Sequence, residues 1–140
     1  MSDRVSQVVL ELHALATAFM AGVAWFVQVV HYPLMARVGA AGWNEYEQAH
    51  GQRTTWVVMP AMLSEALTAF VLAWRSPGLA TVTGLALVGA LWLSTFLVQV
   101  PLHARLERGF DAGVHARLVM SSWFRTGAWS VRAVLAVSWL

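Results

Sequence analysis

The segment LATVTGLALVGALWLSTFLVQVPLH, residues 79–103, decides the class of fold that the sequence predicts. It has no charged side chain between Leu79 and Leu102. A helix of this length can cross the roughly 30 Å of hydrocarbon in a bilayer. Its apolar residues do not alternate with polar ones, as they would in a half-buried strand. The segment therefore predicts a membrane-spanning helix that ends at His103, just before Arg105.

Three further apolar stretches bring the number of predicted helices to four, at roughly 8–31, 54–74, 79–103 and 115–139. The chain is 59% hydrophobic and 11% charged, which leaves too few polar side chains to cover a soluble domain of 140 residues. We therefore expect one integral membrane domain over residues 1–140, an all-α four-helix transmembrane bundle. An even number of crossings puts both termini on one side of the membrane, which we expect to be a plasma membrane (the inner membrane of a bacterium).

The charged residues and the lack of cysteine exclude several classes of function. The chain contains nine arginines and seven acidic residues, which gives a net charge of +2. Because the arginines are spread over the ends of the predicted helices, nucleic-acid binding is not expected. The absence of cysteine excludes disulfides, thiol redox chemistry and thiolate metal ligands. More arginines flank the histidine end of the predicted helices than the other end, which orients the histidines toward the cytoplasm by the positive-inside rule.

Histidine marks the same end of all four predicted helices. His31 and His103 close the first and third helices, and His50 and His115 lie beside the starts of the second and fourth. Because successive helices run in opposite directions, all four imidazoles reach one face of the membrane. Imidazoles that converge from separate helices suit a transition metal (Fe, Cu or Zn), with nitrogens ~2.0–2.2 Å from the ion.

The residues around the histidines fit supporting roles in such a site. Gln28 and Gln99 each precede a histidine by about one helical turn, so we expect them to contribute to cofactor binding by hydrogen-bonding the imidazoles and selecting their tautomer. Glu47, Glu107 and Asp111 can complete the site or orient the rings. Haem held between two histidines, and polar side chains that merely lie at the membrane interface, are the alternatives.

The two halves of the chain repeat parts of each other. Arg53 and Arg125, each followed by threonine, lie 72 residues apart, and the Gln–Val pairs that begin at Gln28 and Gln99 lie 71 apart. This pattern predicts a tandem repeat of two helical hairpins. We expect Arg53 and Arg125 to act as catalytic residues that orient a polar substrate group, and Trp123 to line the binding site. Arginine snorkelling and an interfacial tryptophan belt are the alternative interpretation.

A second polar layer is predicted at ~22–27 Å from the histidine face along the helix axes. It consists of Glu11, His13, Glu65 and Arg132. Charged groups at this depth normally pair, so we expect an ion pair between Glu65 and Arg132. The pair would fix the register of two helices, and a proton or ion path across the bundle is the alternative role.

Proline and glycine divide the predicted helices. Pro33 and Gly39 are expected to break the chain after the first helix. Pro60 is expected to kink the second helix. The polar segment AGWNEYEQAHGQR, residues 41–53, can be a helical lead-in to the second helix. In that case Glu47, His50 and Arg53 stack on one face of it at three-residue spacing.

The order of these motifs resembles a known family. VQVVHYP (27–33), an H-x-x-R before a helix with Pro and Glu, VPLHARL (100–106) and W-F-R-T-x-x-W (123–129) resemble small four-helix membrane proteins of the anthrone-oxygenase-like group. The resemblance covers nearly the whole chain, and V-P-L-[NH]-x-x-L with the later R-T is its most specific part. It implies the four-helix membrane fold and an oxygenase-like activity.

The leading functional hypothesis is a metal-dependent membrane oxidoreductase or oxygenase that acts on a lipophilic substrate admitted from the bilayer. Transport or binding of ions, protons or small molecules is the second hypothesis, and a non-catalytic accessory membrane subunit is the third. The expected partners are the lipid bilayer, a lipophilic small molecule and a second copy of the chain, without nucleic acid.

Overall fold

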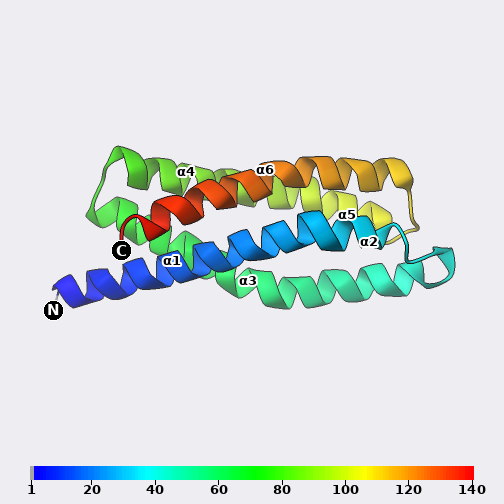
Figure 1. The fold of residues 1–140 in the computed structure, drawn as a ribbon, viewed down its shortest axis with the longest axis horizontal. Helices are drawn as coiled ribbons and strands as arrows, with labels where there is room; N and C mark the ends of the chain where they lie inside the picture. Colours follow the sequence, from blue (N-terminus) through cyan, green and yellow to red (C-terminus); the bar gives the residue numbers. More distant parts are fainter. Residues whose placement is uncertain (1) are drawn as a thin grey trace.

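Four long antiparallel helical rods form the molecule (Figure 1). The computed structural model describes residues 2–140, with side chains from residue 4 onward, and no strand occurs among these residues. The first rod is α1 (Ser2–Phe26), continued by the π-helical turn η1 (Val27–His31) and by α2 (Tyr32–Met35). After the short 3₁₀ helix η2 (Ala40–Gly42), the second rod is α3 (Trp43–Arg75). The third rod is α4 (Leu79–Ser94) with η3 (Thr95–Gln99) and α5 (Val100–Leu106), and the fourth is α6 (Ala112–Val137).

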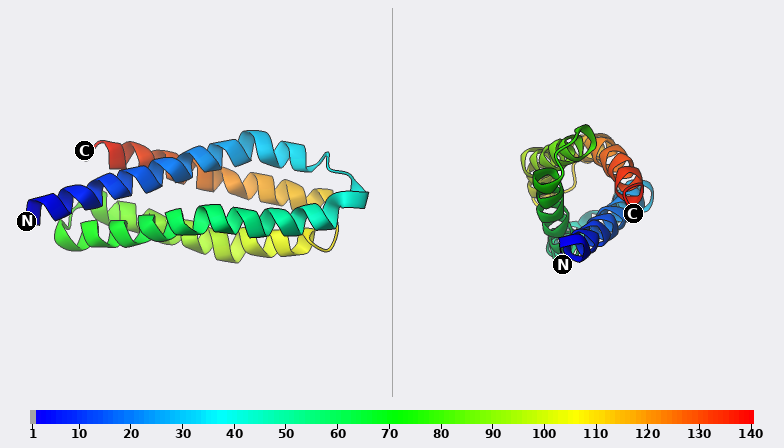
Figure 2. Two further views of the ribbon diagram at one scale, coloured as in Figure 1. Left: turned by 90° about the horizontal axis from the view of Figure 1, so that it is seen from below. Right: turned by 90° about the vertical axis from the view of Figure 1, so that its left-hand side faces the viewer.

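The rods lie at the corners of a square when the bundle is viewed along its axis (Figure 2). α1 packs against α3 and α6, and α4 packs against the same two helices. Both ends of the chain lie at one end of the bundle, beside the turn at 76–78, and the connections at 36–42 and 107–111 lie at the other (Figure 1). We call the second end the histidine end, because His31, His50, His103 and His115 lie near it.

Two π-helical turns, η1 and η3, come just before prolines, Pro33 in α2 and Pro101 in α5. Proline lacks the N–H of a helical hydrogen bond, and its ring collides with the carbonyl four residues back. A wider π turn is one way for a helix to accommodate both effects. The prediction that Pro33 breaks the chain is therefore wrong, since the rod continues to Met35 and the chain turns only at Gly39, where φ is +85°. α3 likewise continues through Pro60.

The observed helices extend beyond the predicted ones at several ends. α3 begins at Trp43 rather than at 54, so the polar segment is helical from residue 43 onward. The Trp43 side chain is 1% exposed, and its Nε1 donates a 2.6 Å hydrogen bond to the carbonyl of Leu106, which anchors the start of α3 to the end of α5. α6 begins at Ala112 rather than at 115, and the side chain of Asp111 caps it.

Three of the rods are long and apolar enough to cross a membrane: Arg4–Met35, Ala40–Arg75 and Leu79–Leu106. Large apolar side chains are exposed on all four rods, among them Leu15, Leu67, Leu97 and Val134. A monomer in water rarely exposes apolar surface on this scale. The exterior of the bundle therefore suits a hydrocarbon environment.

Two clusters of buried apolar residues hold the rods together. The middle cluster contains Met20, Ala21, Ala24, Met62, Leu91, Ala128 and Trp129, which come from all four rods. The end cluster, at the histidine end, contains Tyr32, Met35, Trp43, Leu102, Leu106 and Leu118. The residues that could carry function lie between and around these two clusters.

Candidate functional site

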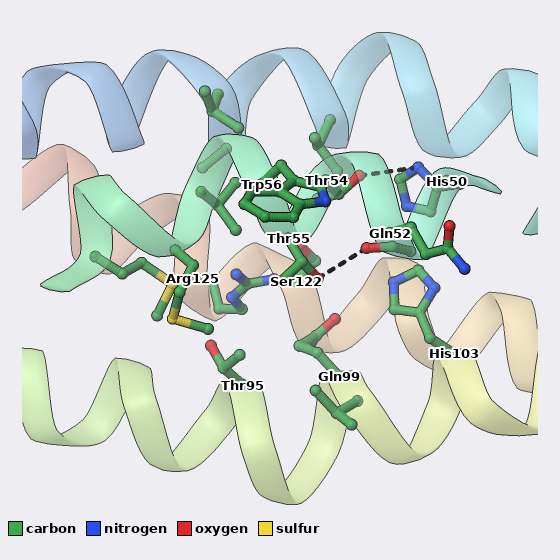
Figure 3. Close-up of a pocket in the computed structure, with 18 of the residues that line it drawn as sticks. His50, Gln52, Thr54, Thr55, Trp56, Thr95, Gln99, His103, Ser122 and Arg125 are labelled. Atoms are coloured by element: carbon green, nitrogen blue, oxygen red, sulfur yellow. Dashed lines mark hydrogen bonds between the residues drawn. The ribbon is translucent and has the colours of Figure 1, made fainter. Parts of the chain in front are cut away.

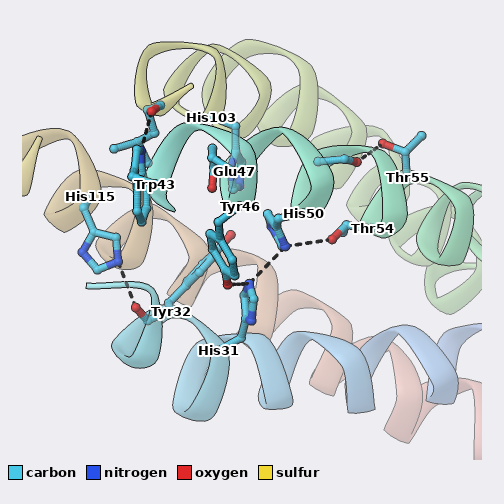
Figure 4. Close-up of polar contacts among 12 residues, drawn as sticks. His31, Tyr32, Trp43, Tyr46, Glu47, His50, Thr54, Thr55, His103 and His115 are labelled. Atoms are coloured by element: carbon cyan, nitrogen blue, oxygen red, sulfur yellow. Dashed lines mark hydrogen bonds and ion pairs between the residues drawn. The ribbon is translucent and has the colours of Figure 1, made fainter. Parts of the chain in front are cut away.

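Of the four histidines at the histidine end, three lie close to one another: His31, His50 and His103 (Figure 4). His31 Nε2 lies 3.1 Å from His50 Nδ1, and the ring centroids of His50 and His103 are 5.3 Å apart. The hydroxyl of Tyr46 lies 3.3 Å from His31 Nε2, and Thr54 Oγ1 lies 3.1 Å from His50 Nδ1. The structure therefore brings His31, His50 and His103 together from three separate rods.

His103 is paired with a buried carboxylate. Its Nδ1 lies 2.5 Å from Oε1 of Glu47, which is 1% exposed, and the other carboxylate oxygen has no hydrogen-bond partner within residues 2–140. A carboxylate that accepts the Nδ1–H bond selects the tautomer in which Nε2 carries a free lone pair. That Nε2 can then accept a proton. We call His31, Tyr46, Glu47, His50, Thr54 and His103 the histidine cluster.

Tyr46 and Thr54 were not predicted, although the sequence contains a signal for them. They lie four residues before and four residues after His50, and residues at this spacing share one face of a helix. Arg53, by contrast, is exposed and does not line the cavity described below. Arg53 lies two residues, or about 200° of rotation, from Thr55, which lines the cavity, so the Arg53 side chain points to the opposite side of α3.

A cavity of about 680 Å³ extends from the histidine cluster into the bundle (Figure 3). Its lining toward the histidine end is polar and includes Gln48, His50, Gln99 and His103. Its lining at the depth of the middle cluster is apolar and includes Met20, Met62 and Trp129. The cavity opens between α3 and the η3–α5 segment, where the exposed lining residues are Gln48, Gln52, Thr55, Trp56, Phe96, Val100, Ala104 and Glu107.

Arg125 points into this cavity (Figure 3). Its guanidinium carbon lies 5.0 Å from the ring centroid of Trp129. Among the residues described, it forms no ion pair, and its Nε is buried without a hydrogen-bond partner. Of the two arginines predicted to orient a substrate, the structure therefore brings only Arg125 to the cavity.

The two predicted glutamines bind α6 rather than the histidines. Gln28 Nε2 donates to the carbonyl of Val119 at 3.2 Å, and Gln99 Nε2 donates to Ser121 Oγ at 2.9 Å. Both side chains are 3% exposed. The expectation that these amides orient the imidazoles is therefore wrong, and both amides instead tie the first and third rods to α6. Gln99 lines the cavity and Gln28 does not.

His115 and Trp123 lie outside the site. His115 Nε2 donates to the carbonyl of Tyr32 at 2.9 Å, away from the other three histidines (Figure 4). Trp123 is 46% exposed, meets Trp25 edge-on at 5.9 Å and does not line the cavity, whereas Trp129 does. His115 and Trp123 lie outside the site because their side chains point away from it, although their positions along the helix axis are suitable.

The histidine cluster is arranged as a hydrogen-bonded network. Two imidazole nitrogens, on His31 and His50, face each other, and the nearest nitrogen of His103 faces Glu47. In the described part of the chain, no group of three or more His, Cys, Asp or Glu side chains is placed to hold a metal ion. The predicted Fe, Cu or Zn site, with His115 as a fourth ligand, does not follow from this arrangement and stays a prediction.

The predicted ion pair between Glu65 and Arg132 is formed on the far side of the middle cluster. Glu65 Oε1 accepts from Arg132 Nε at 2.9 Å, and its Oε2 accepts from Trp129 Nε1 at 3.0 Å. Arg132 Nη1 also donates to the carbonyl of Gly84. Both members of the pair are 2% exposed. This arrangement joins α3, α4 and α6.

The other two residues predicted for this layer, His13 and Glu11, do not lie together. His13 is buried, and its Nδ1 lies 2.9 Å from Thr68 Oγ1 on α3. Glu11 is exposed and accepts a hydrogen bond from Gln7 on its own helix. The layer therefore consists of His13, Glu65, Thr68, Trp129 and Arg132, which we call the ion-pair layer.

Comparison with known proteins assigns neither a family nor a function to the chain. No protein-family model matches the chain, and neither the curated proteins nor the solved structures contain a match to it. The cavity and the residues that line it are therefore the features that indicate a function.

Proposed function

We propose that the protein is an integral membrane protein and that all four rods cross the bilayer. Three rods meet the requirement of length and apolar character. α6 has 26 residues, ~39 Å along its axis, and runs beside the other rods (Figure 1). Its residues Arg125 and Arg132 face the interior, while Met120, Val131 and Val134 are exposed. This distribution supports a fourth crossing, with both chain ends on one side of the membrane.

We infer that this membrane protein binds a lipophilic small molecule in the cavity and that the histidine cluster reacts with it. The observation that carries this inference is the cavity itself, about 680 Å³ and lined by both polar and apolar side chains. Small-molecule sites typically have volumes of roughly 300–1,000 Å³ and a few convergent polar groups among apolar ones. The opening between α3 and α5 faces lipid in the proposed membrane arrangement, which supports entry from the bilayer.

The Glu47–His103 pair supports proton transfer as part of the chemistry. His103 Nε2 can accept a proton from a bound substrate, and the carboxylate 2.5 Å from Nδ1 stabilises the imidazolium that forms. We propose an oxidoreductase or oxygenase reaction in which dioxygen takes up the electrons of the oxidised C–H or O–H bond, because this oxidation also releases protons that such a base accepts. The resemblance carried by residues 100–106 and 123–129 implies the same class of reaction.

A metal-dependent form of this reaction is the second candidate. The observation that favours it is the 3.1 Å separation of His31 Nε2 and His50 Nδ1. Two nitrogens bound to one ion at ~2.1 Å lie roughly 3.0–3.5 Å apart. Carboxylates also commonly orient metal-binding imidazoles, as Glu47 orients His103. A third ligand would require His103 to turn toward the other two rings.

Binding to the cavity can be tested with a quenching probe. The purified protein, in phosphatidylcholine nanodiscs, is titrated with 11-bromoundecanoic acid and with its methyl ester, whose bromine quenches tryptophan fluorescence on contact. Trp56 and Trp129 line the cavity, so we expect saturable quenching. Ala104→Phe, which narrows the opening, should abolish the saturable component. Leu97→Phe, on the exposed surface away from the cavity, should retain it, and equal non-saturable quenching in all three proteins would contradict the proposal.

Elemental analysis of the same preparations tests the metal-dependent candidate. We expect about one equivalent of metal in the wild type and its loss in His31→Ala and His103→Ala. His115→Ala is the matched control, because His115 lies apart from the cluster. Metal-free wild-type protein that still binds the probe would remove the metal-dependent form and leave the binding site.

A further inference from the structure

We propose that the ligand of the cavity is an amphipathic anion and that Arg125 holds its charged group. This inference rests on the proposed function, because it names the chemical class of the molecule that the cavity takes. It starts from the partners of the charged side chains inside the bundle.

The carboxylates inside the bundle already have partners. Glu65 accepts from Arg132 and Trp129, and Glu47 is paired with His103. Arg125 forms no ion pair with any residue of the described chain. A charged group within a membrane bundle normally pairs, because an unpaired charge there is costly. The missing partner of Arg125 is therefore expected to come from a ligand.

The geometry of Arg125 suits an oxyanion. Its Nε is buried and has no hydrogen-bond partner in residues 2–140, so one donor of the planar guanidinium is left for a ligand. The face of Trp129 lies 5.0 Å away and supports the guanidinium plane. Guanidinium donors lie in a rigid fork that matches carboxylate and phosphate oxygens. An arginine held in this way is expected to bind an oxyanion group of a ligand in preference to an uncharged polar group.

The surroundings of Arg125 specify the rest of the ligand. Met59, Met62 and Trp129 line the same cavity and offer an apolar surface to a tail or ring. Among the lining residues of the described chain, one is a carboxylate, Glu107, and it is exposed where α5 ends. It lies at the mouth, about four helical turns from the depth of Arg125 along the bundle. The anionic group is therefore placed inside the cavity and away from Glu107.

Two kinds of molecule share this chemistry. One is a single-chain lipophilic acid with a carboxylate, and the other is a phospholipid with an anionic phosphate. The cavity volume of about 680 Å³ accommodates a small amphiphile or part of a lipid chain. Nanodiscs with and without phosphatidylglycerol separate the two sources. Competition by phosphatidylglycerol that depends on Arg125 identifies the phospholipid, and unchanged probe binding identifies the free acid.

The test compares a charged probe with its neutral twin. 11-Bromoundecanoate and its methyl ester differ in charge at one end and share the same chain and bromine. In phosphatidylcholine nanodiscs we expect the acid to bind the wild type about ten- to hundredfold more tightly than the ester, the range typical of a hydrogen bond to a charged group. Arg125→Gln should remove this preference, Arg125→Lys should keep part of it, and the matched control Arg53→Gln should keep it fully, since Arg53 lies outside the cavity.

A stability measurement accompanies the binding measurement. Without ligand, Arg125→Gln should melt close to the wild type, because it loses the contact with Trp129 but also removes a charge that has no ion-pair partner in the described chain. The acid should raise the melting temperature of the wild type by more than that of Arg125→Gln, whereas the ester should raise both by similar amounts. Equal, saturable binding of acid and ester, or an acid preference that survives in Arg125→Gln, overturns the role of Arg125 while the binding cavity of the proposed function stands. Absence of saturable binding for both probes overturns the two proposals together.

Discussion

The two polar regions of the bundle differ in whether their charged groups pair with each other or border a cavity. In the ion-pair layer, Glu65 and Arg132 are each 2% exposed and pair with each other, both oxygens of Glu65 accept hydrogen bonds, and Arg132 Nη2 has no partner among the described residues but does not border the cavity. At the histidine end, His50 and His103 are partly exposed and border a cavity. One oxygen of Glu47 and the Nε of Arg125 have no partner among the described residues.

This difference separates a structural role from a functional one. Buried charges that pair with each other away from a cavity fix the register of the helices that carry them and are not accessible to a ligand. Unpaired donors and acceptors beside a cavity leave groups that a ligand can satisfy. The middle cluster contributes Met20, Met62, Leu91 and Trp129 between the two regions, one from each rod. This apolar layer favours a binding site at the histidine end over an ion path through the bundle.

The largest expected effect is the all-or-none pattern of membrane topology. The proposed membrane arrangement places the two polar regions toward opposite faces of the membrane, which requires all four rods to cross. Reporter fusions at Arg75 and after Leu140 should report the same side, and a fusion at Gly109 should report the opposite side. Agreement between the fusions at Gly109 and Arg75 would rule out the four crossings and the separation of the two regions.

Loss of the carboxylate in the ion-pair layer should have the next largest effect. Glu65→Gln leaves Arg132 buried without its countercharge, and breaking one side of a buried pair typically costs about 3–5 kcal/mol. Unfolding in mixed micelles with increasing SDS measures this loss. Glu11→Gln, on the exposed face of α1, is the matched control and should change the free energy of unfolding by less than ~0.5 kcal/mol.

A double-mutant cycle then tests whether the two residues act as a pair. The combination of Glu65→Gln with Arg132→Gln should cost less than the sum of the two single changes, because the second change removes the charge that the first left unpaired. Additive losses of free energy would show that the ion pair does not couple α3 to α6.

Much of the fold can be predicted from apolar runs and their order. The four rods, the shared position of both chain ends and the Glu65–Arg132 pair follow from run length and from residue depth along antiparallel helices. The helical lead-in expected for residues 41–53 is confirmed from Trp43 onward. Apolar run length alone starts this helix at 54, because residues 43–53 are polar and the helix there is anchored by a tertiary contact of Trp43. Pro33 was misassigned, because a π turn before it lets the helix continue.

The site was predicted less completely, for a geometric reason. Counting along a helix predicts the level of a residue, and on this basis His31, His50 and His103 were expected together. It does not predict the rotation of each helix about its axis. Arg53 and Trp123 lie at suitable levels but point outward, whereas Arg125 points into the cavity. Packing of whole helix faces sets this rotation, and single-residue spacing does not contain it.

The smallest expected effect is that of Glu47→Gln, the same substitution as Glu65→Gln but in the open region. The amide oxygen of the substituted side chain can still accept from His103 Nδ1, and the His103 side chain, 22% exposed, remains accessible to water. We therefore expect a loss of about 1 kcal/mol in the SDS unfolding assay, well below that of Glu65→Gln. The amide can also donate to Nδ1, so ¹⁵N NMR should show His103 shifted from one tautomer toward a mixture. A loss of stability as large as that of Glu65→Gln, with the tautomer unchanged, would make Glu47–His103 a structural pair and remove the distinction between the two regions.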